Sequence, residues 1–135
     1  MILVDSSVWI DFLSRSPGYA GKELRRFIAD GENFALTGLI LSEVLQGLTH
    51  SVREVEEHLL RWDFLEPSGM ITYREAAAIF RSARAKGVTL TTIDTIIAAI
   101  ALEHGATLFT IDKDFARITR ITPLVLHPSD SKKLQ

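Results

Sequence analysis

Two short apolar runs in this sequence end in aspartate, a side chain that can bind cations or move protons. Ile2-Leu3-Val4 precedes Asp5, and residues 107–111 precede Asp112, with Asp114 two positions further on. Because both runs are rich in apolar and β-branched residues, we predict that they are buried strands. Ligands of open α/β sheets bind beyond the carboxyl ends of the strands. The sequence therefore predicts carboxylates at the edge where such folds build their sites.

Two further carboxylates lie within strongly apolar segments. Asp94 is in the first turn of a predicted helix over 92–104, whose later residues are apolar on every side, as is typical of a buried helix. The partial positive charge at the N-terminus of this helix favours an ionised carboxylate there. Glu43 lies in the middle of a predicted helix over 39–48 and faces either a narrow solvated stripe or a cleft.

If these four segments meet, their carboxylates repel one another, and such a cluster is stable only around a cation. The chain contains no cysteine and no histidines at ligand spacing, so the expected ligands are hard oxygen atoms. Oxygen ligands favour Mg²⁺ or Mn²⁺ over zinc. Structural explanations remain open: Asp5 or Asp94 could cap a helix, Glu43 could be solvated, and Asp112-Lys113-Asp114 could be a polar turn.

The elements that must position these residues alternate between strands and helices, which predicts an α/β domain. Predicted strands cover residues 2–4, 34–36, 64–65, 107–111 and 122–126. Predicted helices cover residues 6–13, 22–29, 39–48, 51–62, 72–85, 92–104 and a short stretch from 115. Thr72 and Glu75 match a capping box. We expect one domain over 1–127, with a mainly parallel sheet of about four to five short strands flanked by helices, and a polar tail over 128–135.

Composition limits the classes of protein to which the chain can belong. Its 135 residues are 47% hydrophobic and 24% charged, as in an ordinary globular domain, and the lack of cysteine excludes a disulfide scaffold and a cysteine nucleophile. A formal net charge of −2 argues against nucleic-acid binding by bulk charge alone, so such binding requires a local basic surface or a metal. Because no stretch resembles a signal peptide or approaches the ~20 apolar residues that span a bilayer, we expect a cytoplasmic protein that does not bind membranes.

Four blocks of sequence carry a resemblance to a known family. They are Leu3-Val4-Asp5-Ser6-Ser7, Ser42-Glu43-Val44-Leu45-Gln46-Gly47, Asp94-Thr95-Ile96-Ile97-Ala98-Ala99 and Thr110-Ile111-Asp112-Lys113-Asp114-Phe115. In order and spacing they resemble a PIN domain, and within that group the VapC toxins of bacterial and archaeal toxin–antitoxin modules. The resemblance covers nearly the whole chain. It implies a PIN-like fold and an endoribonuclease that depends on Mg²⁺ or Mn²⁺.

The resemblance also implies roles for individual residues. The family's four acidic positions fall on Asp5, Glu43, Asp94 and Asp112. The first, third and fourth of these would hold the metal, which activates a water as the nucleophile. Glu43 would orient or deprotonate that water, or complete a second metal site. Asp114 is an alternative to Asp112 as the last ligand, and Ser6 matches a hydroxyl residue that often supports the site.

The substrate and the partners are implied in the same way. Carboxylates repel phosphate, so basic residues must hold the RNA, and we predict Arg84 and Lys113 as contacts, with a solvated helix surface as the alternative. The resemblance implies transfer RNA or a ribosomal RNA loop as substrate, a homodimer, and a VapB-like antitoxin that covers the cleft. Four apolar residues on short helices are predicted to accept an amphipathic partner helix: Trp9, Phe12, Leu59 and Leu60.

Two other functions remain open. Asp112-Lys113-Asp114 after an apolar strand resembles the Asp-x-Asp motif of haloacid-dehalogenase-type phosphatases, although too little chain follows it for that fold. A non-catalytic PIN-like module would bind a partner and cleave nothing, and the four intact acidic positions argue against it.

Overall fold

Four short parallel strands form the centre of the structure, a computed structural model that describes residues 1–128. The strands are β1 (Ile2–Val4), β2 (Phe34–Leu36), β3 (Asp63–Phe64) and β4 (Thr107–Phe109). Their order across the sheet is β3-β2-β1-β4, and every pairing is parallel. The predicted α/β domain with a parallel sheet is confirmed.

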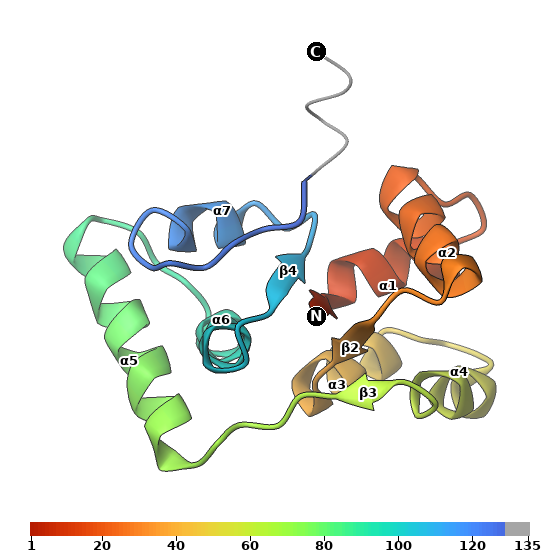
Figure 1. The fold of residues 1–135 in the computed structure, drawn as a ribbon, viewed down its shortest axis with the longest axis horizontal. Helices are drawn as coiled ribbons and strands as arrows, with labels where there is room; N and C mark the ends of the chain where they lie inside the picture. The colour runs from red at the N-terminus through yellow and green to blue at the C-terminus, as the bar shows by residue number, and fades with distance from the viewer. Residues whose placement is uncertain (129–135) are drawn as a thin grey trace.

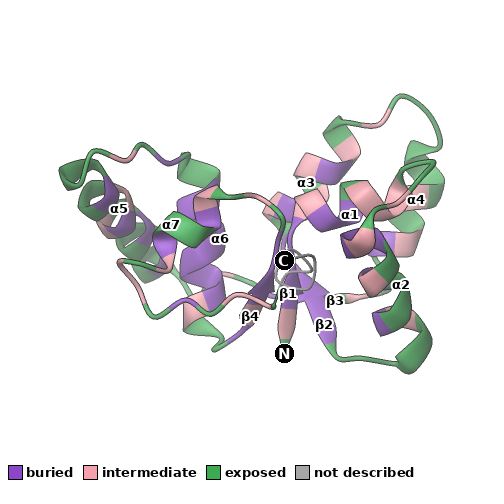
Figure 2. Ribbon diagram, turned by 90° about the horizontal axis from the view of Figure 1, so that it is seen from above, coloured by how far each residue is buried: buried purple, intermediate pink, exposed green. Residues whose placement is uncertain are grey.

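Helices cover both faces of this sheet (Figures 1 and 2). One group consists of α1 (Ser6–Leu13), α2 (Tyr19–Asp30), α3 (Gly38–Gln46) and α4 (Val52–Leu59). The other group consists of α5 (Met70–Ala85), α6 (Thr92–Glu103) and α7 (Asp114–Ile118). Strands covered on both faces are apolar without alternation, which explains why β1, β2 and β4 read as continuous apolar runs. Figure 2 shows these strands and α6 as the most buried elements.

The order of the strands creates a switch point between β1 and β4. The chain adds β2 and then β3 on one side of β1, and β4 afterwards pairs with the other side of β1. Leu3 is in register with Ala35 on one side and with Leu108 on the other. In such sheets the crevice beyond the carboxyl ends of the two switch-point strands is the usual binding place. Asp5 and Thr110 are the first residues beyond these two strands.

Several predicted boundaries are wrong. The capping box at Thr72 does not exist, because α5 begins at Met70 and the Thr72 hydroxyl, inside the helix, accepts a hydrogen bond from the Ser68 amide. The strand predicted over 107–111 ends at Phe109, since Thr110 leaves the ladder to bind Asp5. The strand predicted over 122–126 is reduced to a single bridge between Leu126 and Leu108.

The predicted docking surface for a partner helix is also corrected. Trp9 and Leu59 are completely buried, and Trp9 packs against Phe34 in the core between α1 and the sheet. Of the four predicted residues, Phe12 is half-buried and only Leu60, which is 54% exposed, faces solvent freely. These apolar side chains therefore pack mainly within this chain.

The helices between residues 1 and 128 are too short or too polar to cross a bilayer. The predicted polar tail over 128–135 lies, apart from its first residue, outside the described residues.

Candidate active site

Asp5 lies at the point where β1 turns into α1. It is only 3% exposed, and it is the N-cap residue of α1. Its Oδ2 atom accepts hydrogen bonds from the Ser7 hydroxyl at 2.7 Å and from the Thr110 hydroxyl at 2.8 Å. Buried carboxylates need such donors, because an unpaired charge in the interior is costly. Asp5 therefore does cap α1, as the structural explanation predicts, and the capping atom is Oδ2.

Ser7 and Thr110 also fix the loop that follows β4. The Ser7 hydroxyl accepts a hydrogen bond from the Ile111 amide at 3.1 Å, and the Thr110 hydroxyl accepts one from the Asp112 amide at 3.0 Å. The end of β1 and the end of β4 are therefore held together through side chains. Sequence reasoning missed both hydroxyl residues. Their only signal was proximity in sequence to Asp5 and Asp112.

Asp94 enters the same region from the first turn of α6. The hydroxyl of Thr91, the N-cap residue, accepts a hydrogen bond from the Asp94 amide at 3.1 Å. One carboxylate oxygen each from Asp94, Asp112 and Asp114 lie within 4.8 Å of one another. The Asp114 amide donates to Asp112 Oδ1 at 2.9 Å, which fixes the turn that carries two of these side chains. Asp112 therefore both accepts a hydrogen bond that holds this turn and belongs to the cluster.

Glu43 reaches the same edge from the opposite face of the sheet. It lies on α3, whose N-terminus is capped by the Thr37 hydroxyl. Its Oε1 atom accepts a hydrogen bond from the Ser6 hydroxyl at 3.0 Å, and the side chain is half-buried. Ser6 therefore supports Glu43, whereas Ser7 supports Asp5. The five predicted acidic residues are gathered around the switch point, and three of them, Asp94, Asp112 and Asp114, form a group that could hold a single ion.

The pKa values of these carboxyl groups reflect their burial and their closeness to one another. Burial, followed by the charge of Asp112, raises the pKa of Asp94 from 3.8 to about 6. Burial likewise raises the pKa of Glu43, and the charges of Asp5 and Asp112 add to the effect. The pKa of Asp5 is also raised by burial, although the hydrogen bonds from Ser7 and Thr110 oppose the shift. Carboxyl groups that resist ionisation in the absence of a cation are well suited to bind one.

The donor set at this edge fits a divalent cation. Asp94, Asp112 and Asp114 offer hard oxygen atoms, and the chain contains no cysteine. An all-carboxylate site of this kind can hold a metal through its oxygen ligands, some of them reached through water. The cluster includes both candidates for the last ligand, so it does not select between Asp112 and Asp114.

The two predicted RNA contacts differ in their surroundings. Lys113 is exposed and lies between Asp112 and Asp114 in the acidic turn. Arg84 is exposed on α5, with its guanidinium 5.8 Å from the centre of the Phe80 ring. A guanidinium over an aromatic face is favourable in itself, so Arg84 already has a partner within the chain.

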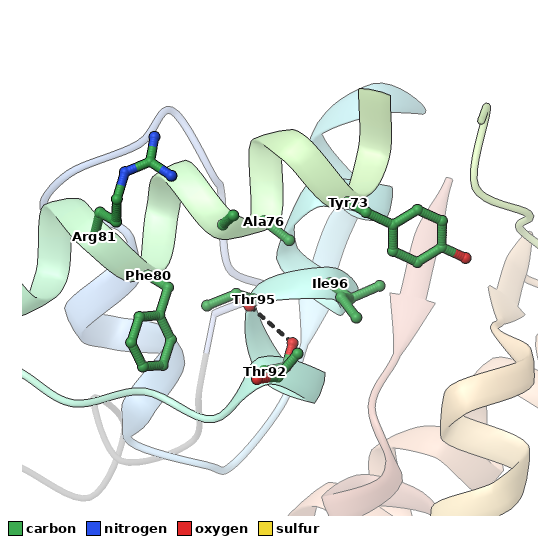
Figure 3. Close-up of a pocket in the computed structure, with 8 residues that line it drawn as sticks. Tyr73, Ala76, Phe80, Arg81, Thr92, Thr95 and Ile96 are labelled. Carbon is green, nitrogen blue, oxygen red and sulfur yellow. Dashed lines mark hydrogen bonds between the residues drawn. The ribbon is translucent and has the colours of Figure 1, made fainter. Parts of the chain in front are cut away.

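A groove of about 290 Å³ runs between α5 and α6 beside the first turn of α6 (Figure 3). Phe80 and Arg81 line one end of it, next to Thr92, and Tyr73 lines the other end with Ile96. A second hollow of about 300 Å³ continues from the same two residues, Tyr73 and Ile96, toward the start of α3. The surface between α5 and the first half of α6 is therefore largely apolar.

Comparisons with known proteins agree with this geometry. The sequence matches the PIN-domain family over residues 2–121. It is 36% identical to ribonuclease VapC11 of Mycobacterium tuberculosis over 128 residues, which cover 92% of this chain and 96% of that protein. The structure of VapBC2 from Rickettsia felis, bound to a DNA fragment from its promoter, matches with a TM-score of 0.72 at 20% identity, over 96% of this chain and 100% of that one. A toxin–antitoxin complex from Klebsiella pneumoniae matches with a TM-score of 0.66 at 21% identity, over 93% of this chain and 100% of that one.

Proposed function

Because this chain belongs to the PIN-domain family, in the branch of the VapC ribonucleases, we propose that it is the toxin of a type II toxin–antitoxin module and acts as a metal-dependent endoribonuclease. The observation that carries the proposal is the cluster of Asp94, Asp112 and Asp114, with Asp5 and Glu43 at the same edge of the sheet. No structural role requires so many carboxylates to converge.

The proposed metal is Mg²⁺ or Mn²⁺, held by Asp94 and Asp112 with Asp5, and with Asp114 as a further ligand. When bound, such an ion lowers the pKa of a water molecule and offsets the charge that develops on the scissile phosphate. Ser7 and Thr110 hold the carboxylate of Asp5 in place through one of its two oxygens. Holding ligands in this way is the usual task of groups that hydrogen-bond to metal-binding side chains.

Glu43 is the proposed base. Its carboxylate is held by Ser6, and its raised pKa makes it a better proton acceptor than an ordinary glutamate. It takes the proton of the attacking water, whose oxygen bonds to phosphorus as the bond to the 3′ oxygen breaks. The departing 3′ oxygen takes up a proton, and the products carry a 5′-phosphate and a 3′-hydroxyl.

The first test is metal dependence. The purified chain should cleave RNA in the presence of Mg²⁺ or Mn²⁺, lose this activity in excess chelator, and regain it when the metal is restored. Gel analysis of total transfer RNA and ribosomal RNA, with end-group analysis of the fragments, measures this. Release of phosphate from small esters without RNA cleavage would instead support the phosphatase. A stable protein complex with neither activity would support the binding module.

Transfer RNA or a ribosomal RNA loop is the proposed substrate, with Lys113 and Arg84 as contacts. Lys113 is supported by its place inside the acidic turn, where a cation beside the carboxylates reduces their repulsion of phosphate. Arg84 is supported by its exposure on α5. A VapB-like antitoxin is the proposed protein partner, which agrees with the similarity to toxin–antitoxin complexes.

We also propose that the chain forms a homodimer through the α5–α6 groove. Met70, Ile71 and Tyr73 at the start of α5 are 75%, 50% and 44% exposed. Of these three residues, Tyr73 lines both of the hollows, which meet at Tyr73 and Ile96. Contiguous apolar surface of this kind is uncommon on monomers and marks interfaces.

Replacing Tyr73 with aspartate should weaken this dimer by more than about 10-fold, because a charge would be buried at the centre of the interface. Light scattering over a range of protein concentrations measures the effect. Val125→Asp is the matched control, because Val125 is also an exposed apolar residue and lies outside the groove. A wild-type chain that stays monomeric, or a Tyr73→Asp variant that dimerises normally, would contradict the proposed interface.

A further inference from the structure

Three cationic side chains surround a hollow where the end of α5 meets α7. The hollow has two adjoining lobes, of about 400 and about 520 Å³, which share Lys86 and Arg120. Arg117 lines the first of these lobes. Among the described residues that line either lobe, none is acidic. We call this feature, defined by Lys86, Arg117 and Arg120, the cationic hollow.

The local structure brings these cations together. Lys86 is the C-cap residue of α5, which ends where Gly87 adopts a positive φ of 80°. Arg117 is in the last turn of α7, and Arg120 lies three residues further on. Cations at helix C-termini are favourable in themselves, because they face the negative end of the helix dipole. That effect accounts for one cation at each helix end, but it does not require three of them to line one concave surface.

These side chains remain available to a ligand. Within the described part of the chain, Arg117 has one acidic partner, Asp114, at 3.9 Å, and both side chains are well exposed. Ion pairs of this length and exposure contribute little and are easily exchanged. Arg26 shows the contrast, because Glu23 and Asp30 bind its guanidinium at 2.7 and 3.1 Å and satisfy its charge.

The cationic hollow is next to the acidic cluster. Asp114, a member of the cluster, is the first residue of α7, and Arg117 is one turn further along the same helix. A helix of five residues is roughly 7.5 Å long. An RNA strand with one phosphate at the cluster therefore needs to extend only a short distance to place its next phosphates over the hollow.

We propose that the cationic hollow binds the phosphates of RNA next to the scissile bond, a role that rests on the proposed ribonuclease function. The acidic cluster repels a polyanion, and a bound divalent ion offsets only part of that charge. Phosphate contacts supply most of the affinity and fix the register of a nucleic acid without reading its sequence. Lys86, Arg117 and Arg120 are thus positioning residues for the strand.

The test measures RNA binding apart from cleavage. A fluorescein-labelled single-stranded RNA of about 16 nucleotides and mixed sequence is titrated with the Asp94→Asn protein, by anisotropy, from about 50 to 200 mM KCl. Adding Lys86→Gln and Arg120→Gln should weaken binding by about 10-fold at low salt. The slope of log affinity against log salt should become shallower by about 0.7 for each phosphate that the variant no longer neutralises.

The control pair is Arg53→Gln with Arg61→Gln, two exposed arginines on and just after α4, in the group of helices on the other face of the sheet (Figure 2). This pair removes the same charge and should leave the slope unchanged. An unchanged slope in the Lys86 and Arg120 variant, or an equal change in the control pair, would overturn the proposal. If the slope responds as expected but the wild-type chain cleaves no RNA, the ribonuclease proposal fails while the binding site stands.

Discussion

Replacing Asp94 with asparagine should reduce metal-dependent RNA cleavage by about 10³-fold while the chain stays folded. Asparagine has almost the same shape and keeps the backbone hydrogen bond to Thr91, so α6 keeps its N-cap. It removes the negative charge from the centre of the carboxylate cluster, where Asp94 faces Asp112 and Asp114. Losing one charged group that stabilises a transition state commonly costs about 10² to 10³-fold, and a lower metal affinity adds to this.

The same variant should be more stable than the wild type without metal. The pKa of Asp94 is about 6 in the fold and 3.8 in its unperturbed state, so the folded chain binds more protons between these values. The free energy of unfolding of the wild type therefore falls as pH rises between these two pKa values. Asparagine does not ionise, so the variant does not lose stability in this range. Above pH 6 we expect a gain on the order of 1 kcal/mol, reduced by solvent screening, or about 3–4 °C in Tm.

Thermal melts with and without Mg²⁺, combined with cleavage assays, measure both effects. Mg²⁺ should raise the Tm of the wild type but not that of Asp94→Asn, since a ligand stabilises only the state that binds it. Asp63→Asn is the matched control, because Asp63 is exposed at the start of β3. Full activity in Asp94→Asn, or equal stabilisation of both proteins by Mg²⁺, would show that the metal site is elsewhere.

Replacing Glu43 with glutamine should lower kcat by about 10² to 10⁴-fold, the range in which a general base contributes. Glutamine keeps an oxygen that can accept the hydrogen bond from Ser6, so the side chain stays in place. It can no longer take a proton from water. KM should change little. In the wild type, kcat should rise with pH as Glu43, whose pKa is raised, loses its proton, and this rise should be absent from the glutamine variant.

Calorimetric titration with Mn²⁺ separates the two roles assigned to Glu43. An unchanged number of bound ions, together with low kcat, supports the base. One ion fewer than in the wild type identifies Glu43 as a ligand of a second metal and rules out the role of base alone. Glu56→Gln, an exposed glutamate on α4, is the matched control and should behave as the wild type.

Much of the fold could be predicted because buried elements have a clear hydrophobic pattern in the sequence. β1, β2 and β4 are covered on both faces, so each appears as an uninterrupted apolar run, and α6 is apolar on every side because it packs between the sheet and α5. The capping box at Thr72 failed because the same spacing occurs inside helices, where the hydroxyl can serve a neighbouring loop. Local pattern does not distinguish these two cases.

The candidate site was predicted in part. The places of Asp5 and Asp112 follow from strand ends, which a single sequence can show. Only the family resemblance indicated that Glu43 lies close to Asp5 and Asp112, because strand order depends on contacts between distant segments. The burial of Trp9 and Leu59 was missed for the same reason: periodicity shows that a side chain is apolar, but not which neighbouring helix covers it.

The bonds from Ser7 and Thr110 to Asp5 have a consequence for the order in which the molecule matures. The Thr110 bond joins residues 105 positions apart, and β4, the last of the four strands in the described part of the chain, pairs directly with β1, the first. Contacts so distant along the chain form late, since most of the polypeptide must be present before they close. A nascent chain that ends before residue 107 lacks Thr110, Asp112 and Asp114, so the acidic site assembles only after β4 and the turn that follows it have been synthesised.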